Sequence, residues 1–379
     1  MRGNVAVAVF GAGLALAIAG AAPSNTFAQT PERWQQAMPE AEDRKRGAEI
    51  SHAIRTRSWL EGAQKADLWD GGHAVSHYSA YLYQMVGRSD LVGALERRGK
   101  LSERPPCPPA TDLRPALKTV LARVGDHRVV ILNDSHDHAH SRVLLHLLLE
   151  PLRSLGFTHL SVEDFDPDPE AYAKLAYPGQ AKAWQSSREP VFADAIRHAI
   201  KIGYRLFPHE VDWEQLLALP EKKQLQFRED AQARNLIDHV LSADPDSRIL
   251  VYAGHQHAFE AIVEKISPTY KPMALRLKEL AGIDPLTVDQ TGCWTGEPAS
   301  VPGPIAFDKD GNSIAAGMAE GRVDLQIRQP KPADRDRADW LRRLGRVPVA
   351  VPEGLRDGLA PVVVEARLAN EPENAVPLD

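Results

Sequence analysis

The sequence predicts an α/β fold: a mainly parallel sheet flanked by helices, with a helical N-terminal portion and a small β-rich C-terminal extension. Two observations predict this class. From residue 116 onward, short apolar runs alternate with longer helical patterns, as they do in βαβ units. The runs are also hydrophobic at successive positions, which is typical of strands covered on both faces. With 379 residues, 43% of them hydrophobic, the chain is long enough for one large domain or two modest ones.

Four apolar runs between residues 115 and 283 are expected to be the strands of an α/β core. They cover residues 128–133, 159–163, 204–208 and 248–253. Helices are expected at residues 141–155, 191–202, 222–241, 260–265 and 273–280. Gly156 and Gly203 directly follow the first two, at the position where glycine commonly ends a helix. Because parallel strands need crossover connections, this alternation predicts helices on both faces of one sheet.

The two flanks of this core differ from it in composition. Residues 29–114 are predicted to be a helical segment followed by a Pro-rich linker. The expected helices cover residues 32–46, 48–66 and 74–88, and the linker covers 101–114. Residues 284–379 contain short candidate strands separated by Gly and Pro, at 286–290, 323–327, 347–351 and 362–366. They predict a β-rich extension, which either lengthens the sheet or forms a small appended unit.

The first 28 residues are expected to be a signal peptide. Arg2 precedes an apolar run at residues 5–22, and Thr26-Phe27-Ala28 has the pattern of a cleavage site. A retained membrane anchor is the alternative. Cleavage predicts a periplasmic or secreted protein with no stable membrane anchor, so residues 1–28 are left out of the predicted fold.

Export also bears on the two cysteines, Cys107 and Cys293. In an oxidising compartment a pair so far apart in sequence is expected to form a disulfide, the alternative being two buried thiols. The net charge of −6, without a long Lys/Arg block, excludes nucleic acid as an expected partner. A small molecule or a peptide is the expected substrate, and the sequence leaves the oligomeric state open.

Ionisable side chains follow each of the four predicted strands. The first strand leads into Asn133-Asp134-Ser135-His136-Asp137-His138, and the fourth into Gly254-His255-Gln256-His257. Glu163 ends the second strand, and His209 and Glu210 follow the third. Because the carboxyl ends of parallel strands lie along one edge of a sheet, we expect these side chains to form a shared polar site.

Each of these side chains has a predicted role. The expected catalytic residues are Asp134, His136, Glu163 and His257. The expected substrate-binding residues are His209, Glu210, Arg228 and Asn235. Arg228 and Asn235 are seven residues apart on a predicted helix and therefore share a face, whereas most of that helix, Glu229 included, is expected to face solvent.

Two chemistries fit these residue types, and the sequence does not choose between them. In one, a divalent metal lowers the pKa of a bound water. Its expected ligands are His136, His138, Glu163, His255 and His257. In the other, a histidine is the general base and a carboxylate fixes its tautomer. Structural alternatives also exist: Asp134 and Ser135 can cap the next helix, and His138 can lie exposed at its start.

The first strand and its motif, residues 129–140, resemble the opening of the superfamily of haem-uptake ChaN-like, Tiki and erythromycin-esterase proteins. There the first strand ends in Gly-Glu-x-His or Gly-Glu-x-x-His, a later strand ends in Glu, and a still later one in Gly-x-x-His. The matching positions here are His136, Glu163 and the Gly254–His257 motif, preceded by the helix that carries Arg228 and Asn235. The resemblance covers about residues 115–283. Asn133-Asp134 replaces Gly-Glu, and the histidine spacing is closer to the ChaN-like form.

The resemblance implies a site more firmly than a substrate, because the superfamily includes haem-binding lipoproteins, metal-dependent proteases and antibiotic esterases. The leading expectation is hydrolysis of an ester or amide bond. The alternative is a non-enzymatic haem- or metal-binding protein of the cell envelope. No lipobox cysteine lies near the predicted signal peptide, so a lipoprotein anchor is not expected.

A second resemblance concerns only the first motif. Asp134-x-His136-x-His138 is similar to the first-strand motif of metal-dependent amidohydrolases and of polymerase-and-histidinol-phosphatase-type phosphoesterases. Those proteins are barrels of seven or eight strands. Only four β-α units are visible in this sequence before the pattern changes, which favours an open sheet over a barrel.

Overall fold

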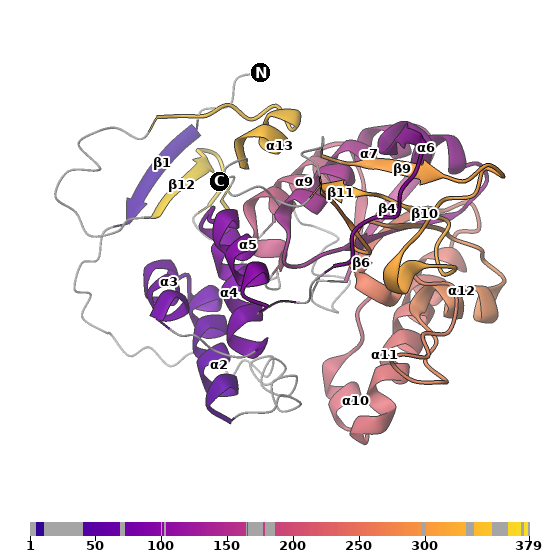
Figure 1. Ribbon diagram of the computed structural model, residues 1–379, viewed down its shortest axis with the longest axis horizontal. Coiled ribbons are helices and arrows are strands. Elements are labelled where there is room, and N and C mark those ends of the chain that lie inside the picture. Colours follow the sequence, from indigo (N-terminus) through magenta and orange to yellow (C-terminus); the bar gives the residue numbers. More distant parts are fainter. Residues whose placement is uncertain are drawn as a thin grey trace.

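The computed structural model confirms the predicted α/β class. It describes residues 5–10, 41–68, 73–99, 101, 104–163, 165, 177–178, 186–296, 301–330, 337–350, 363–372 and 375–377. A six-stranded sheet is flanked by helices, and a helical N-terminal part lies beside it (Figure 1). In the described part of the chain the sheet does not close on itself, so the alternative of a closed barrel is wrong.

The central sheet is parallel throughout. Its strands are β3 (Val129–Asp134), β4 (Phe157–Val162), β5 (Arg205–Pro208), β6 (Arg248–Gly254), β7 (Leu286–Asp289) and β10 (Leu325–Gln326). They pair in the order β10-β7-β3-β6-β4-β5. The last of the four predicted core strands, β6, is therefore inserted between the first two, with Gly254 opposite Asp134 of β3.

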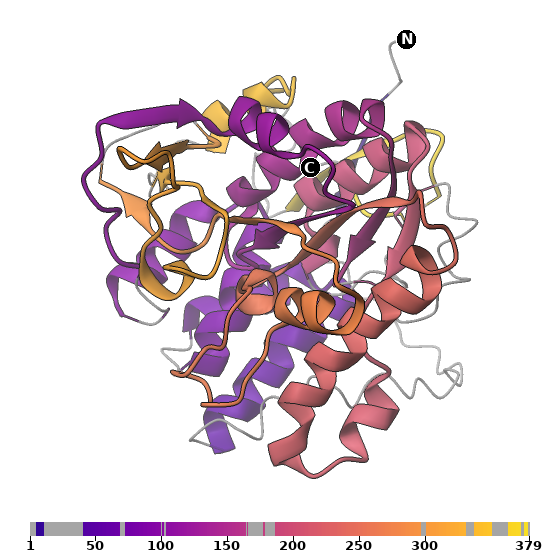
Figure 2. The same ribbon diagram turned by 90° about the vertical axis from the view of Figure 1, so that its right-hand side faces the viewer.

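Helices cover both faces of the sheet, because successive strand residues point in opposite directions. One face packs against α6 (Ala116–Arg123), α7 (Arg142–Ser154) and α9 (Pro190–Lys201), and includes Val130 and Leu132 of β3. The other face packs against α11 (Glu221–Leu236) and α12 (Met273–Ala281), and includes Val129 and Ile131. Figure 2 shows α11 and α12 in front of the strands.

The N-terminal helices form a bundle with its own apolar core. They are α2 (Ala41–Thr56), α3 (Trp59–Leu68), α4 (His73–Met85) and α5 (Ser89–Arg97). Ile50, Ile54 and Leu82 are completely buried between them. The predicted helix at 48–66 is divided after Thr56, where Arg57 takes a positive φ of 61°. The predicted helix at 32–46 lies partly outside the described residues, and its last part belongs to α2.

The C-terminal region both lengthens the sheet and forms smaller pairs. Two of its strands, β7 and β10, join the central sheet, which is the first of the two arrangements expected for residues 284–379. The smaller pairs are β2 (Asp112–Pro115) with β9 (Pro304–Phe307), and β8 (Trp294–Thr295) with β11 (Gln329–Pro330). No strand forms at residues 347–350, the described part of one predicted strand.

The remaining elements are short. They are α10 (Trp213–Leu217), α13 (Arg337–Arg343), the 3₁₀ turns Ala139–Ser141, Ser186–Arg188, His255–Ala258 and Gly317–Ala319, and a π-helical turn, Ile237–Leu241, that continues α11. The helix expected at residues 260–265 is wrong, because this segment forms turns. Pro268 and Pro272 follow this segment closely, and a helix that began there could not continue through either proline.

The chain ends meet in a separate two-stranded sheet. Strand β1 (Val5–Phe10) pairs antiparallel with β12 (Val363–Leu368). Strand β1 lies inside the expected signal peptide, whose cleavage stays a prediction. No helix in the described ranges is both long and apolar enough to span a bilayer.

The two cysteines are joined in the structure. Cys107 and Cys293 form the expected disulfide, which links the Pro-rich segment to the loop after β7. Backbone hydrogen bonds reinforce this link, since the Cys107 N–H donates to Trp294 O and the Trp294 N–H donates to Pro105 O. The linker is therefore fixed against the β-rich region.

Candidate active site

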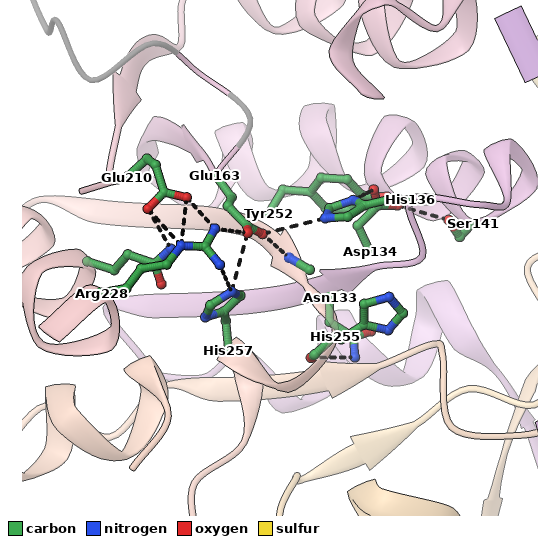
Figure 3. Close-up of polar contacts among 12 residues, drawn as sticks. Asn133, Asp134, His136, Ser141, Glu163, Glu210, Arg228, Tyr252, His255 and His257 are labelled. Atoms are coloured by element: carbon green, nitrogen blue, oxygen red, sulfur yellow. Dashed lines mark hydrogen bonds and ion pairs between the residues drawn. The ribbon is translucent and has the colours of Figure 1, made fainter. Parts of the chain in front are cut away.

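The order of the strands decides which polar side chains meet. Because β6 lies between β3 and β4, the turn that follows β6 is flanked by the ends of both. Figure 3 shows the result: Glu210, Arg228, Glu163 and His136 lie in a row along the carboxyl edge of the sheet. The expected shared polar site is therefore assembled from β3, β4, β5, β6 and helix α11.

His136 and Asp134 form an imidazole–carboxylate pair at the end of β3. His136 Nδ1 lies 2.8 Å from Asp134 Oδ2. The other carboxylate oxygen accepts hydrogen bonds from the hydroxyls of Ser141 (3.1 Å) and Tyr252 (2.7 Å). Asp134 is almost completely buried, whereas 22% of the His136 side chain is exposed. This arrangement places the ring proton on Nδ1 and leaves the basic lone pair on Nε2.

Arg142, the first residue of α7, keeps Asp134 ionised. Its guanidinium lies 3.5 Å from Asp134 Oδ2 and 2.9 Å from Glu189 Oε2. Burial raises the pKa of the Asp134 carboxyl, but Arg142 and His136 lower it by more, so the pKa lies below its ordinary value. His136 therefore has a fixed negative charge on its Nδ1 side.

Glu163 is the centre of the site. One oxygen, Oε1, accepts a hydrogen bond from Arg228 (2.5 Å) and lies 3.3 Å from His257 Nε2. The other oxygen accepts a hydrogen bond from the backbone N–H of Gly254 and lies 3.9 Å from His136 Nε2. Burial raises the pKa of Glu163, but His257 and Arg228 lower it by more, and the net shift is well below the ordinary value. Glu163 is thus a carboxylate facing His136.

Arg228 links Glu163 to Glu210. Its Nε donates to Glu210 Oε1 (3.1 Å), and its Nη2 bonds both carboxylates. Gln232 also donates to Glu210 (3.2 Å), and the guanidinium lies 5.5 Å from the centre of the Trp213 ring. Two of the four residues expected to bind substrate, Arg228 and Glu210, are therefore paired with each other, and Arg228 holds Glu163 in place.

His257 lies between two carboxylates. Its Nδ1 is 2.8 Å from Glu229 Oε2, and its Nε2 is 3.3 Å from both Glu163 Oε1 and Arg228 Nη1. Burial lowers the pKa of His257, but Glu229 and Glu163 outweigh burial and raise it to about 10. A protonated imidazole has no lone pair for a metal or for proton abstraction. His257 therefore contributes a positive charge beside Glu163.

Gly254 has a role that its motif did not reveal. A Cβ at this position would lie 2.6 Å from His136 Nε2, closer than carbon can approach, and 3.1 Å from Glu163 Oε2, tighter than most such contacts. Only glycine lets the β6 backbone pass between these two side chains while its N–H donates to Glu163. The next residue, His255, has a positive φ of 37°, an uncommon conformation for a residue other than glycine.

Other predicted residues are engaged away from this group. His138 is buried rather than exposed, and its Nε2 lies 3.1 Å from Glu96 Oε1 of α5. Asn235 donates to the backbone carbonyls of His209 (3.2 Å) and Glu210 (2.9 Å), so it shapes the end of β5 instead of offering its amide to a substrate. Neither side chain joins the central group.

His209 is buried beside the site in its neutral form. Its Nδ1 lies 2.8 Å from the hydroxyl of Ser161, and its Nε2 has no hydrogen-bond partner within the described part of the chain. Burial lowers the pKa of His209 to about 3. A substrate-binding role for His209 stays a prediction.

The five expected metal ligands do not form a ligand set. Across the described ranges, no group of three His, Cys, Asp or Glu side chains is arranged to hold a metal ion. Arg228 already supplies the positive charge that Glu163 needs, and His138 is bound to Glu96. The His255 ring makes an edge-on contact with the His136 ring, 5.9 Å between centroids. The five side chains are therefore not arranged as one ligand set in the described residues, and metal binding by any of them stays a prediction.

Sequence reasoning missed several residues that hold the site together. Glu229 is completely buried, although most of its helix was expected to face solvent. Arg142 begins a Leu-rich helix and Tyr252 lies in an apolar strand, so periodicity places both in the core without showing their polar contacts. The sequence did contain one indication of such a contact. Arg142 is a charged residue in an otherwise apolar helix, and a buried charge requires a partner.

Comparisons with known proteins show limited similarity. No protein-family model and no curated protein matches the chain. Among solved structures, the type III effector HopBA1 is 16% identical, with a TM-score of 0.36 over 59% of this chain and 99% of the other. RRSP, a MARTX toxin effector domain from Vibrio vulnificus, is 11% identical, with a TM-score of 0.33 over 77% of this chain and 51% of the other. The C-terminal region of Pasteurella multocida toxin is 11% identical, with a TM-score of 0.29 over 73% and 37%.

The chain spans about half or less of the length of the last two structures. Because every TM-score is below 0.5, we base no inference on these similarities. The fold and the site define an α/β protein with an imidazole–carboxylate centre at the carboxyl edge of a parallel sheet. Membership of the ChaN-like, Tiki and erythromycin-esterase superfamily stays a prediction.

Proposed function

We propose that this protein hydrolyses an ester or amide bond, with His136 as the general base that activates water. The observation that supports this most directly is the Asp134–His136 pair, in which a buried carboxylate holds Nδ1 at 2.8 Å while part of the imidazole is exposed. A carboxylate on Nδ1 orients the ring and stabilises the imidazolium that forms when Nε2 takes a proton.

Glu163 adds to this stabilisation from the opposite side of the ring. Its carboxylate lies 3.9 Å from His136 Nε2 and is held by Arg228, His257 and the Gly254 N–H. Because these contacts exist before any substrate binds, the charge needs no rearrangement during the reaction. When His136 accepts a proton from water, the new positive charge lies between two fixed carboxylates.

The proposed reaction assigns no role to a metal, because two of the candidate ligands, His257 and Glu163, are already engaged. Both ring nitrogens of His257 and both oxygens of Glu163 have partners within the chain. The non-enzymatic alternative, haem or metal binding by the same histidines, makes a different prediction. It requires stoichiometric uptake of haemin or of a divalent metal by the purified protein.

We also propose that the mature protein acts in the periplasm or outside the cell, after removal of residues 1–28. The apolar run and the cleavage pattern in the sequence support this location. The disulfide between Cys107 and Cys293 adds support, since such bonds persist in oxidising compartments. The substrate class that fits is a small molecule or a peptide.

The test is replacement of His136 by Asn, with hydrolysis of a panel of acyl esters and anilides as the measurement. We expect kcat to fall by roughly 10²–10⁴, the usual contribution of a general base, while the melting temperature stays near that of the wild type. His52→Asn, at an exposed position on α2, is the matched control and should keep full activity. Unchanged turnover by His136→Asn, or no turnover by the wild type together with a Soret shift on adding haemin, contradicts the proposal.

A further inference from the structure

A second imidazole–carboxylate pair lies next to the first. Asp137 directly follows His136 in sequence, and its Oδ1 lies 3.5 Å from Nδ1 of His77 on helix α4. The side chain of His77 is 29% exposed, more than that of Asp137. As in the Asp134–His136 pair, the imidazole is the more accessible partner, although the 3.5 Å contact is longer than the 2.8 Å hydrogen bond of the first pair.

Helix α4 brings His77 to the site together with two neighbours. His77, Tyr81 and Gln84 are spaced so that they share one face of the helix. The Tyr81 ring contacts both imidazoles, at 4.5 Å from His77 and 6.3 Å from His136 between centroids. Gln84 Nε2 donates to the backbone carbonyl of His136 (3.0 Å), which fixes the helix against the motif.

The groups around His77 favour the protonated form of its imidazole. Among the described residues, the titratable groups that contact it include Asp137 from the loop after β3, and Tyr78 and Tyr81 from its own helix. The carboxylate is the charged group among them, and it stabilises a protonated imidazole at His77. The two carboxylates beside His136 are already paired with cations, Asp134 with Arg142 and Glu163 with Arg228 and His257. Their negative charge is therefore partly neutralised at His136, whereas Asp137 faces the His77 imidazole. The two imidazoles can for this reason hold different protonation states.

We propose that His77 is the general acid of the reaction, protonating the leaving group while His136 activates water. This inference rests on the proposed hydrolase function. His136 Nε2 takes one proton from water as the oxygen attacks the acyl carbon. As the tetrahedral intermediate collapses, the acyl–oxygen or acyl–nitrogen bond breaks, and the leaving atom takes a proton from the His77 imidazolium. Proton exchange with solvent then restores both rings, and one water is consumed.

This division of work makes a specific prediction about substrates. An acid that protonates the leaving group matters for alkoxide or amine leaving groups, which are strong bases, and matters little for p-nitrophenolate, which leaves as an anion. The probes are therefore acyl esters with one acyl group and a series of leaving groups, from p-nitrophenol through 4-methylumbelliferone to ethanol, together with the matching alkyl amide.

The variants are His77→Gln and Asp137→Asn, with His52→Gln on α2 as the matched control. We expect His77→Gln to lower kcat/KM for the ethyl ester and the amide by about 10²-fold or more, with less than about a 3-fold change for the p-nitrophenyl ester. Asp137→Asn should show the same selectivity to a smaller degree. The pH profile for the ethyl ester should lose its alkaline limb in His77→Gln and keep its acid limb.

The outcomes separate this inference from the function on which it rests. If His77→Gln slows every ester equally while its melting temperature is unchanged, or leaves all of them unchanged, His77 is not the general acid even though His136 remains the base. If the wild type hydrolyses none of the probes, the hydrolase function itself is overturned. If His77→Gln has a lower melting temperature, its slower turnover could reflect partial unfolding. Asp137→Asn then decides: the assignment of His77 stands only if this variant slows the ethyl ester and the amide more than the p-nitrophenyl ester.

Discussion

Gly254 shows how a missing side chain can determine the geometry of a site. The β6 backbone passes between His136 and Glu163, where a Cβ would come within 2.6 Å of His136 Nε2. We predict that Gly254→Ala lowers kcat by roughly 10²-fold, because displacing reacting groups by about 1 Å has effects of this size. Steady-state kinetics on the acyl ester series is the measurement.

Gly296→Ala is the control for this substitution, since no atom lies within 4 Å of a Cβ built there. It should behave as the wild type in the same assay. Full activity in Gly254→Ala would mean that the contact among Gly254, Glu163 and His136 has no part in the reaction.

The charge on His257 predicts how stability depends on pH. Its pKa is about 10 in the folded protein, against about 6.5 for an unperturbed histidine. A folded pKa above the unfolded value stabilises the protein fully below pH ~6.5, and this stabilisation is lost as pH rises through about 10. We therefore expect the free energy of unfolding of the wild type to fall over this window more steeply than that of His257→Asn. Urea unfolding of both proteins at several pH values measures this, and parallel curves would contradict it.

Two consecutive charged residues of helix α11, Arg228 and Glu229, contact different partners. Arg228 reaches Glu163 and Glu210, while Glu229 accepts hydrogen bonds from His257, from the Tyr270 hydroxyl (2.6 Å) and from the Met273 N–H (2.8 Å). Met273 begins α12, so Glu229 joins the two helices on this face of the sheet. The buried carboxylate of Glu229 thus both connects α11 to α12 and contacts the His257 imidazole at the site.

We predict that Glu229→Ala destabilises the protein by about 3–5 kcal/mol, because it leaves a buried imidazolium without one of its two carboxylates. Arg234→Ala, at an exposed position on the same helix, should change stability by less than about 0.5 kcal/mol. Denaturant unfolding monitored by circular dichroism compares the two. Equal stabilities for the two variants would show that Glu229 is not an anchor.

Across the whole molecule, a disulfide connects distant parts of the chain. Cys107 and Cys293 are 186 residues apart, and the loop they close contains β3, β4, β5, β6 and β7. Removing the bond in a Cys107→Ser/Cys293→Ser variant should lower the free energy of unfolding by about 2–5 kcal/mol, because the unfolded chain gains conformational freedom. Thermal melts with and without reductant test this. The variant should be insensitive to reductant, and a wild type that is equally insensitive would contradict the prediction.

The sequence by itself determined the α/β class, the four core strands and the edge at which polar residues collect. These follow from local patterns: an apolar run marks a buried strand wherever it pairs, and parallel strands place their carboxyl ends together. Asp134, His136, Glu163 and His257 were therefore found from the ends of their own strands.

Only the tertiary structure decided how those residues interact. The insertion of β6 between β3 and β4 depends on strand pairing, which a local pattern does not encode, and it places Gly254 between His136 and Glu163. The same holds for Arg228, which forms ion pairs with Glu163, one of the expected metal ligands, and with Glu210. It also holds for His77, which reaches Asp137 only because the N-terminal helices pack against the first motif. Strand ends can be located from sequence, but the partners of a buried charge come from segments far away along the chain.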